Sequence, residues 1–372
     1  MEKFDVVVAG CGVAGLMLAR KLSELGLRAL LVESGEVVAN GPSTRNEGWL
    51  HRGTYHAVSI RDRASAIRVA RRCIYGHEQV KAFAPEAIEE PHGAAYALVR
   101  DAARADEAHS RWLEAGVSFA EVSTSEVARV APGADLSRVA AAFRVEDKSV
   151  DTRLLYRKLL AVSESRGAKL LLGHTARPLP DGALDVRGPS GERVAVDAPI
   201  CIHTVGYGAS TAFGASLPLR YWKSHLLVVA RVCEPGLFFL GPGEAAMMHH
   251  GGASIVGLNE DATRCEGPSF DVEPEGARRL ADALRRLHPW LRSNDVKEVA
   301  CTKIDLAEDA RGSRSLDISV GEPIPGHICV FPGKMTEAPY VADHVARIVA
   351  TRIGLGRIAA RPCDSFLEGV AA

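Results

Sequence analysis

The sequence predicts an α/β protein with two domains, one built on a doubly wound parallel sheet and one on a mixed, more antiparallel sheet. Three observations support this fold class. Residues 5–33 follow a strand–helix–strand pattern, Gly and Pro separate short apolar runs after residue 225, and 372 residues are enough for two domains. A composition of 47% hydrophobic residues with a net charge of −1 is globular and excludes a disordered chain.

Charge and cysteine usage narrow the class of protein. The near-zero net charge argues against a nucleic-acid-binding protein. The eight cysteines stand singly, which argues against a zinc ribbon or an iron–sulfur cluster and favours reduced thiols in a cytoplasmic protein. The charge-free stretch 198–219 is interrupted by Gly, Ser, Thr and Pro. We therefore expect a cytoplasmic location and no integral membrane contact.

The first 33 residues carry the clearest pattern. The β-branched run 5–9 predicts a buried parallel strand. Residues 13–25 place apolar side chains at helical spacing and end at Gly26, a residue typical of a helix C-terminus. Residues 28–33 predict a second buried strand. This order and length match one βαβ unit of a doubly wound sheet.

The rest of the chain predicts a coarser series of elements. A loop at 35–55 is followed by two or three helices between 60 and 116. The later expected elements are a helix at 149–166, strands at 168–172, 193–196 and 199–202, further strands at 226–232, 237–240 and 253–256, a helix at 275–287, a strand at 328–331 and a last helix ending at Gly354. The strands at 193–196 and 199–202 are expected to return to the first sheet.

A glycine motif lies between the first strand and the first helix. Residues 10–15 fit G-x-G-x-x-G, in which Gly10 permits the turn, Gly12 lets a pyrophosphate approach and Gly15 lets the helix pack closely. Glu33 ends the second strand, where its carboxylate can accept from ribose hydroxyls. The motif predicts a Rossmann-type dinucleotide-binding domain without separating FAD from NAD. Its expected cofactor-binding residues are Gly10, Gly12, Val13, Ala14, Gly15, Glu33 and Ser34.

Four further segments resemble one enzyme family. Residues 43–55 read S-T-R-N-E-G-W-L-H-R-G-T-Y. This string resembles a segment of L-2-hydroxyglutarate dehydrogenases, which belong to the FAD-dependent oxidoreductases together with D-amino-acid oxidase and glycerol-3-phosphate dehydrogenase. Residues 146–151, 201–208 and 330–336 resemble the mid-chain V-D-P signature, a strand-and-turn motif and the G-K-x-T of the same family. The resemblance runs over residues 5–345.

The resemblance implies a discontinuous fold and a redox reaction. A glutathione-reductase-like FAD-binding domain would consist of residues 1–80, 146–215 and 300–372, and a mixed-sheet α+β substrate domain of residues 81–145 and 216–299. Such enzymes bind FAD and transfer a hydride to flavin N5 from a C–H bond that bears a hydroxyl or an amine. We expect a small carboxylate-bearing substrate and, as electron acceptor, O2 or a quinone or other electron carrier.

The resemblance also implies site residues. His51 is the candidate base, because its ordinary pKa of about 6.5 suits proton removal near neutrality, or else a flavin anchor. Arg45 and either Arg311 or Arg314 are candidate carboxylate ligands. The other expected catalytic residues are Tyr55, His249 and Lys334. The further expected cofactor-binding residues are Ser43, Thr44, Arg45, Asn46, Gly48, Ala176, Gly206, Gly208, Gly333, Lys334, Met335 and Thr336.

Several of these residues have a second interpretation. Gly333 to Thr336 are expected to open the last helix, with its N–H groups toward the flavin, and Thr336 also fits a plain helix N-cap. His249 and His250 are adjacent on an expected strand and would point to opposite faces, so they do not predict a metal site, and no metal is expected. Glu47, Trp49 and His56 depart from the family string.

Three functions stay open on the sequence. The first is a dehydrogenase or oxidase of a small 2-hydroxy acid close to 2-hydroxyglutarate, which the string at 51–55 favours. The second is an amine or amino-acid oxidase of the same fold, in a biosynthetic pathway for example. The third is a flavin-binding protein without turnover. A flavin monooxygenase is a weaker interpretation, because a second nucleotide motif is absent from the sequence.

Overall fold

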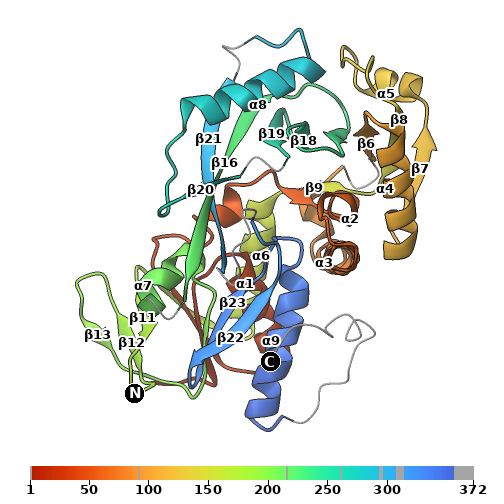
Figure 1. Ribbon diagram of the computed structural model, residues 1–372. Helices are drawn as coiled ribbons and strands as arrows, with labels where there is room; N and C mark the ends of the chain where they lie inside the picture. The colour runs from red at the N-terminus through yellow and green to blue at the C-terminus, as the bar shows by residue number, and fades with distance from the viewer. Residues whose placement is uncertain are drawn as a thin grey trace. The chain divides into compact units, whose positions relative to one another are not determined.

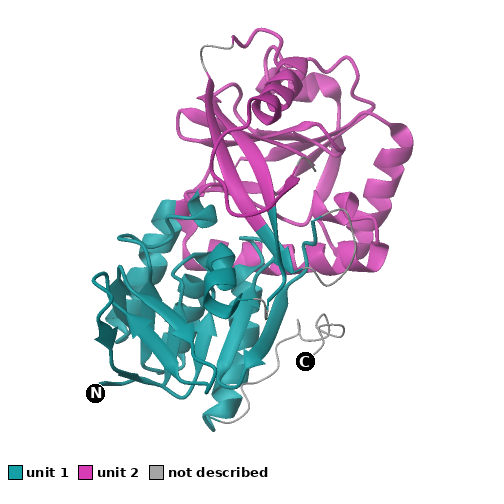
Figure 2. Ribbon diagram, turned by 60° about the vertical axis from the view of Figure 1, so that its left-hand side comes forward, with its two compact units in different colours: residues 1–44, 153–221, 304–372 teal, residues 45–152, 222–303 magenta. Residues whose placement is uncertain are grey.

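The computed structural model describes residues 2–90, 93–214, 217–259, 262–292, 296–306 and 314–355. Its chain divides into two units, which Figure 2 colours separately. Unit 1 consists of residues 1–44, 153–221 and 304–372, and unit 2 of residues 45–152 and 222–303.

This division differs from the expected one. Residues 45–80 and 146–152 were expected in the first domain, and the structure places them in unit 2. The reason is local packing: helix α3 (Arg63–Phe83) lies against α4 (Ala102–Ala115), with Arg63 Nη2 2.6 Å from Glu114 Oε2.

Unit 1 is built on a six-stranded sheet. Its strands, in spatial order, are β10 (Lys169–Leu172), β3 (Ala29–Glu33), β2 (Val6–Ala9), β15 (Cys201–His203), β23 (His327–Phe331) and β22 (Ser319–Ile324). All neighbouring strands are parallel except β22 and β23. The strands β2, β3 and β15 are almost fully buried, as their apolar runs predict.

Helices and a small antiparallel sheet cover this central sheet. The helices are α1 (Val13–Glu24), α6 (Thr152–Ser165), α7 (Ala209–Phe213) and α9 (Ala338–Arg352). Helices α1 and α9 pack side by side (Figure 1). Lys21 on α1 pairs with Asp343 on α9 at 2.8 Å. The small sheet consists of β11 (Thr175–Pro178), β12 (Leu184–Arg187) and β13 (Arg193–Val194).

One strand prediction in unit 1 is wrong. Residues 193–196 were expected to return to the central sheet. Instead, β13 pairs with β12, and β14 (Val196–Asp197) pairs with the N-terminal β1 (Glu2–Lys3). The run is not buried as a central strand would be: Arg193 and Ala195 are exposed, and Val194 and Val196 are only partly buried.

Unit 2 is built on a nine-stranded, largely antiparallel sheet. Its main path is β20 (Thr263–Cys265), β16 (Leu219–Ala230), β19 (Ala253–Leu258), β18 (Ala245–His250), β17 (Gly236–Phe239), β6 (Ala95–Val99), β8 (Ala141–Val145) and β7 (Phe119–Val122), and β21 (Val296–Leu306) pairs with β16. Strand β6 lies inside the stretch for which only helices were expected. Its run Ala-Tyr-Ala-Leu-Val is short and fully buried, and such a run does not distinguish strand from helix by periodicity.

The remaining elements of unit 2 flank the main sheet. They are α2 (His56–Ser59), α5 (Thr124–Val130), α8 (Pro274–Leu287) and a second sheet of β4 (Trp49–Leu50), β9 (Lys148–Val150) and β5 (Ile88–Glu89). The six-stranded, mostly parallel sheet of unit 1 and the nine-stranded mixed sheet of unit 2 confirm the predicted α/β class with a second, mixed-sheet unit. Among the residues that the structure describes, no helix is long and apolar enough to span a bilayer.

Candidate functional site

The glycine-rich loop between β2 and α1 is shaped by backbone packing. Gly10 has a φ of +89°, and a Cβ there would lie 2.8 Å from the Thr204 carbonyl oxygen. A Cβ at Gly15 would lie 2.0 Å from the Gly10 carbonyl oxygen. A Cβ at Gly12 would meet only Ser43 Oγ, at 2.9 Å. The fold therefore requires Gly10 and Gly15, whereas Gly12 leaves the loop surface open to a ligand.

The N-terminus of α1 offers donors to an anion. Its N-cap is Gly12, without a side-chain capping bond, and its first turn holds no acidic residue. Ser43 Oγ accepts from the Val13 N–H at 3.0 Å. The other first-turn amides, those of Ala14 and Gly15, have no acceptor one turn earlier in the helix. Together with the positive end of the helix dipole, these groups suit a phosphate.

Glu33 joins the end of β3 to the glycine-rich loop. Its Oε2 accepts from the Cys11 N–H at 2.8 Å, and its Oε1 accepts from the Gly35 N–H at 2.9 Å and from the Ser34 hydroxyl at 3.3 Å. A carboxylate has about four lone-pair sites, so Glu33 can also accept from ribose hydroxyls.

Two later segments lie beside this loop. Strand β11 starts next to the end of β3, where the His174 N–H donates to the Glu33 carbonyl at 2.9 Å. Ala176, on β11, has its side chain in the apolar core of unit 1, so only its backbone can contact a ligand. After β15, Thr204 Oγ1 donates to the Gly10 carbonyl at 2.6 Å.

Gly206 and Gly208 follow Thr204 in the short 3₁₀ helix η3 (Gly206–Gly208). Gly206 has a φ of +56°, and a Cβ there would meet nothing within 4 Å. Gly208 has an ordinary φ of −70°, and a Cβ there would only touch Val205 Cβ at 3.7 Å. Packing inside the protein therefore does not explain the glycine at 208.

The segment expected to open the last helix forms a turn instead. Helix α9 begins at Ala338, so the expectation that Gly333, Lys334, Met335 and Thr336 open it is wrong, and so is Thr336 as N-cap. Glu337 is the N-cap and Pro339 lies in the first turn, where proline favours a helix start. A Cβ at Gly333 would lie 2.5 Å from the Leu316 carbonyl oxygen, and this contact explains the glycine.

The two candidate arginines differ in what the structure says of them. Arg311 lies outside the described residues. Arg314 is partly buried, and its Nη2 donates to the Gly333 carbonyl at 3.2 Å. Arg314 is thereby tied to the turn before α9.

In unit 2, strand pairing brings two sequence motifs together. β4 and β9 are antiparallel, with Leu50 opposite Lys148. The next residues outward are His51 and Asp147, and His51 Nδ1 lies 3.9 Å from Asp147 Oδ1. The candidate base therefore has a carboxylate neighbour from the mid-chain motif. Sequence alone did not distinguish Asp147 from the other acidic residues of this motif.

Asp147 is fully buried and richly hydrogen-bonded. Its Oδ1 accepts from Trp49 Nε1 at 2.8 Å and from the Arg52 N–H at 3.2 Å, and its Oδ2 accepts from the Thr54 hydroxyl. Burial raises the pKa of Asp147, while the donors from Thr54, Arg52 and Trp49 favour the ionised form. The three donors hold the carboxyl group in one orientation beside His51.

Aromatic rings fix the plane of His51. Its ring lies 4.2 Å from that of Trp49 and 4.3 Å from that of His56, measured between centroids. Tyr55 packs against both of these neighbours, at 5.7 Å from Trp49 and 5.2 Å from His56. Trp49 and His56 are buried, so their departure from the family string shapes the surroundings of His51 directly.

Arg45, Asn46 and Gly48, expected at the cofactor, make their described contacts inside unit 2. The guanidinium of Arg45 lies over the Phe270 ring, 4.5 Å from its centroid. Asn46 Oδ1 accepts from the Gly48 N–H at 2.8 Å. A Cβ at Gly48 would lie 2.3 Å from His250 Cε1, and this contact explains the glycine.

The two adjacent histidines have separate partners. His249 Nδ1 bonds with Ser254 Oγ at 2.7 Å and its Nε2 with the Pro235 carbonyl at 2.5 Å. Burial lowers the pKa of His249 to about 4. His250 Nδ1 lies 2.8 Å from Glu89 Oε1. Both ring nitrogens of His249 are engaged inside unit 2, which favours a structural role over a catalytic one.

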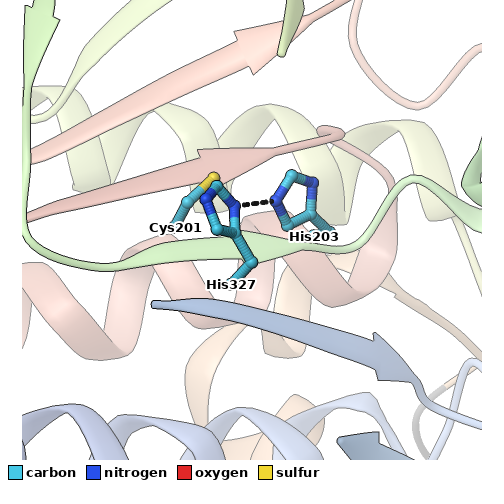
Figure 3. A group of neighbouring side chains, drawn as sticks. All are labelled: Cys201, His203 and His327. Atoms are coloured by element: carbon cyan, nitrogen blue, oxygen red, sulfur yellow. Dashed lines mark hydrogen bonds between the residues drawn. The ribbon is translucent and has the colours of Figure 1, made fainter. Parts of the chain in front are cut away.

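A third group went unnoticed in the sequence. Cys201, His203 and His327 bring one possible metal-ligand atom each to within 4.8 Å of the others, all buried in unit 1 (Figure 3). His203 and His327 are 124 residues apart, so only the pairing of β15 with β23 reveals the group. The sole signal in the sequence was the i, i+2 spacing of Cys201 and His203 on a strand.

The fold and the glycine-rich loop define a dinucleotide-binding protein, and comparison with known proteins specifies the family. The family model described as "DAO: FAD dependent oxidoreductase" matches residues 5–347. The chain therefore belongs to this family, binds FAD and is an enzyme, and the alternative of a flavin-binding protein without turnover is set aside. The glycine-rich loop, the open helix N-terminus and Glu33 fit the cofactor.

Named relatives cover different parts of the chain. A subunit of the anaerobic glycerol-3-phosphate dehydrogenase of Escherichia coli (strain K12) is 26% identical over 387 residues, spanning 98% of this chain and 69% of the relative. The mitochondrial L-2-hydroxyglutarate dehydrogenase of Arabidopsis thaliana is 32% identical over 91 residues, spanning 24% of this chain and 17% of the relative.

Solved structures share the fold at low identity. The glycine oxidase of Geobacillus kaustophilus is 17% identical, with a TM-score of 0.73 over 98% of both chains. The L-proline dehydrogenase of P. horikoshii is 16% identical, with a TM-score of 0.75 over 98% of this chain and 96% of that chain. At such identities these likenesses concern the fold alone.

Proposed function

We propose that the protein oxidises the C–H bond beside the hydroxyl of a small carboxylate substrate, close in chemistry to 2-hydroxyglutarate. In this proposal unit 1 binds FAD and unit 2 supplies the substrate-binding residues. The observation that carries it is the cluster around His51, where a buried, hydrogen-bonded carboxylate lies 3.9 Å from Nδ1 of an imidazole held between two rings.

The roles of the residues follow from their positions. FAD, when bound, accepts the hydride from the substrate carbon. His51 takes the hydroxyl proton at Nε2, since Nδ1 faces Asp147. The Asp147 carboxylate stabilises the imidazolium that forms, and the donors from Trp49 and Thr54 keep that carboxylate in place. Arg45, in unit 2, is the proposed carboxylate ligand.

The test is turnover with an artificial electron acceptor. The panel contains L- and D-2-hydroxyglutarate, glycerol 3-phosphate, glycine and L-proline, and the oxidised product is identified by mass spectrometry. The proposal predicts a 2-oxo acid from one 2-hydroxyglutarate enantiomer and little turnover of the amines. Turnover confined to glycine or L-proline would instead show an amine oxidase.

Reoxidation of the reduced protein distinguishes the electron acceptors. Rapid reoxidation in air with release of hydrogen peroxide indicates O2 as acceptor. Slow reoxidation in air that a soluble quinone accelerates indicates a quinone or another carrier. Both measurements use the same reduced sample, so they do not depend on the substrate assignment.

A further inference from the structure

The group of Cys201, His203 and His327 arises from strand pairing in the central sheet of unit 1. Cys201 and His203 are two residues apart on β15, so their side chains share one face of the sheet. The parallel neighbour β23 places His327 opposite Cys201. All three side chains are at least 97% buried. Figure 3 shows them converging.

The separations suit a tetrahedral metal ion. The three possible ligand atoms lie within 4.8 Å of one another, and His203 Nε2 lies 3.0 Å from His327 Nδ1. Two imidazole nitrogens bound to zinc at about 2.1 Å are about 3.4 Å apart in a tetrahedron. A shift of a few tenths of an ångström brings the two nitrogens to this separation, and in the bound state the Cys201 sulfur lies about 3.6 Å from each of them.

Hydrogen bonding prepares His327 as a ligand. Its Nε2 lies 3.0 Å from the Gly182 carbonyl oxygen, which can only accept, so Nε2 carries the proton. The lone pair of Nδ1 then points toward His203. Metal-binding histidines characteristically donate their other N–H to such an oxygen. His203 offers the second imidazole nitrogen, Nε2, which faces His327 Nδ1.

A cavity provides access to the group. It has a volume of about 580 Å³ and is lined by Cys201, His327, Gly182, Pro325 and Gly326 among others. It therefore offers a path for an ion and room for a water molecule as a fourth ligand.

We propose that Cys201, His203 and His327 bind a zinc ion. One thiolate and two neutral imidazoles are ligands that Zn²⁺ prefers, whereas Mg²⁺ and Ca²⁺ require oxygen. The site has a consequence for the cofactor. β15 leads directly into Thr204, whose hydroxyl holds the Gly10 carbonyl of the glycine-rich loop. Zinc that fixes β15 against β23 therefore strengthens FAD binding.

The experiment measures zinc and FAD in the same samples. Holoprotein from zinc-supplemented cells is dialysed, and both are counted per chain by mass spectrometry and absorbance. We expect about one zinc in the wild type and in Cys329→Ser, the control, because Cys329 is a buried thiol opposite His203 that lies outside the group. We expect less than a tenth of that in Cys201→Ser and His327→Gln. X-ray absorption of the wild type should show one sulfur and two imidazole ligands.

Several results would overturn the proposal. The first is a wild-type protein that contains no zinc. The second is a Cys201→Ser variant with as much zinc as the wild type, and the third is a metal other than zinc bound to the same ligands. Where a variant does not fold, the wild type alone decides: a chelator must remove one zinc, weaken FAD binding several-fold and lower the melting temperature, and added zinc must reverse all three. If the protein stays folded and its FAD affinity does not change when zinc is removed, the proposed effect of zinc on FAD binding is contradicted.

Discussion

Asp147 is the residue on which the arrangement around His51 depends. In Asp147→Asn the amide oxygen can still accept from Trp49 and the Arg52 N–H, so the fold should persist. The negative charge beside the imidazolium is lost and the ring is held less well. We expect substrate-dependent reduction of the flavin to slow about 100-fold, a typical cost of misplacing a reacting group. Rapid-mixing absorbance measures it.

His51 itself should matter more than Asp147. Removal of a general base typically slows the reaction 10²- to 10⁴-fold. We expect flavin reduction by substrate in His51→Asn to be slowed about 10⁴-fold, at the upper end of that range. The control is His109→Asn, an exposed histidine of α4 that packs near Phe119. Equal rates in His51→Asn and the wild type would exclude His51 as the base.

Gly12 and Gly15 should respond differently to a methyl group. Gly15→Ala places Cβ 2.0 Å from a backbone oxygen and should prevent folding of unit 1. Gly12→Ala meets only the Ser43 hydroxyl and should fold, yet lose at least 10-fold in FAD affinity, because the methyl group stands where a pyrophosphate approaches. Full FAD occupancy of Gly12→Ala would contradict the assigned binding surface.

For single residues, motifs in the sequence predict the functional role, but they do not predict which side chains come into contact in the fold. His51 stood out because its string resembles a family segment, and the glycines because their spacing is characteristic. Asp147 did not stand out, because Glu146 and Asp151 in the same segment are equally acidic. Only the register of β4 with β9 distinguishes it. Cys201 and His327 likewise meet only through sheet pairing.

At the scale of elements, the turn before α9 invites a test. Gly333 and Gly354 both have positive φ, of +67° and +76°. A Cβ at Gly333 would lie 2.5 Å from a carbonyl oxygen, whereas a Cβ at Gly354 would meet nothing within 4 Å. We expect Gly333→Ala to cost about 3 kcal/mol and Gly354→Ala about 1 kcal/mol in the free energy of unfolding. Denaturant titration compares the two, and equal costs would refute the contact.

Element predictions succeed where periodicity is long and fail where the run is short. The helices α1 and α8 were predicted within a residue or two, because each buries a continuous apolar stripe. The strand β6 was missed as a short buried run. The start of α9 was placed too early because the G-K-x-T string resembles a helix opening, whereas Gly333 and Pro339 delay the helix.

At the scale of the whole molecule, buried histidines predict sensitivity to acid. Desolvation lowers the pKa of His77 to about 3 and those of His249 and His288 to about 4, from 6.5. The unfolded chain binds these protons below pH 6.5 and the folded chain does not. Stability is therefore fully present above pH 6.5 and falls as the pH drops toward 4. The raised pKa of Asp147 acts in the opposite direction, as one group against four, since burial also lowers the pKa of His203.

The measurement is the melting temperature between pH 7.5 and 4.5. A stable His77→Gln variant should show a shallower decline, corresponding to about one proton fewer taken up on unfolding. His109→Gln, which changes an exposed side chain, should follow the wild type. Parallel curves for His77→Gln and the wild type would show that His77 titrates normally.

The protein family was predictable from the sequence, whereas the division of the chain into two units was not. The motif and the resemblance predicted FAD and the family, which the family match confirms. The resemblance implied the FAD-binding domain for residues 45–80, whereas the structure groups them with unit 2. The packing partners of this segment, α4 and β9, come later in the chain, and no local signal announces such pairings.

The most direct test of the proposed reaction is the visible spectrum of the pure protein, recorded without air before and after addition of L-2-hydroxyglutarate and, in a second sample, of D-2-hydroxyglutarate. We expect the flavin spectrum of the wild type to bleach with one of the two enantiomers, and that of His51→Asn to bleach far more slowly with the same enantiomer. A flavin spectrum that stays unchanged with both enantiomers but bleaches with an amino acid would contradict the assigned substrate class.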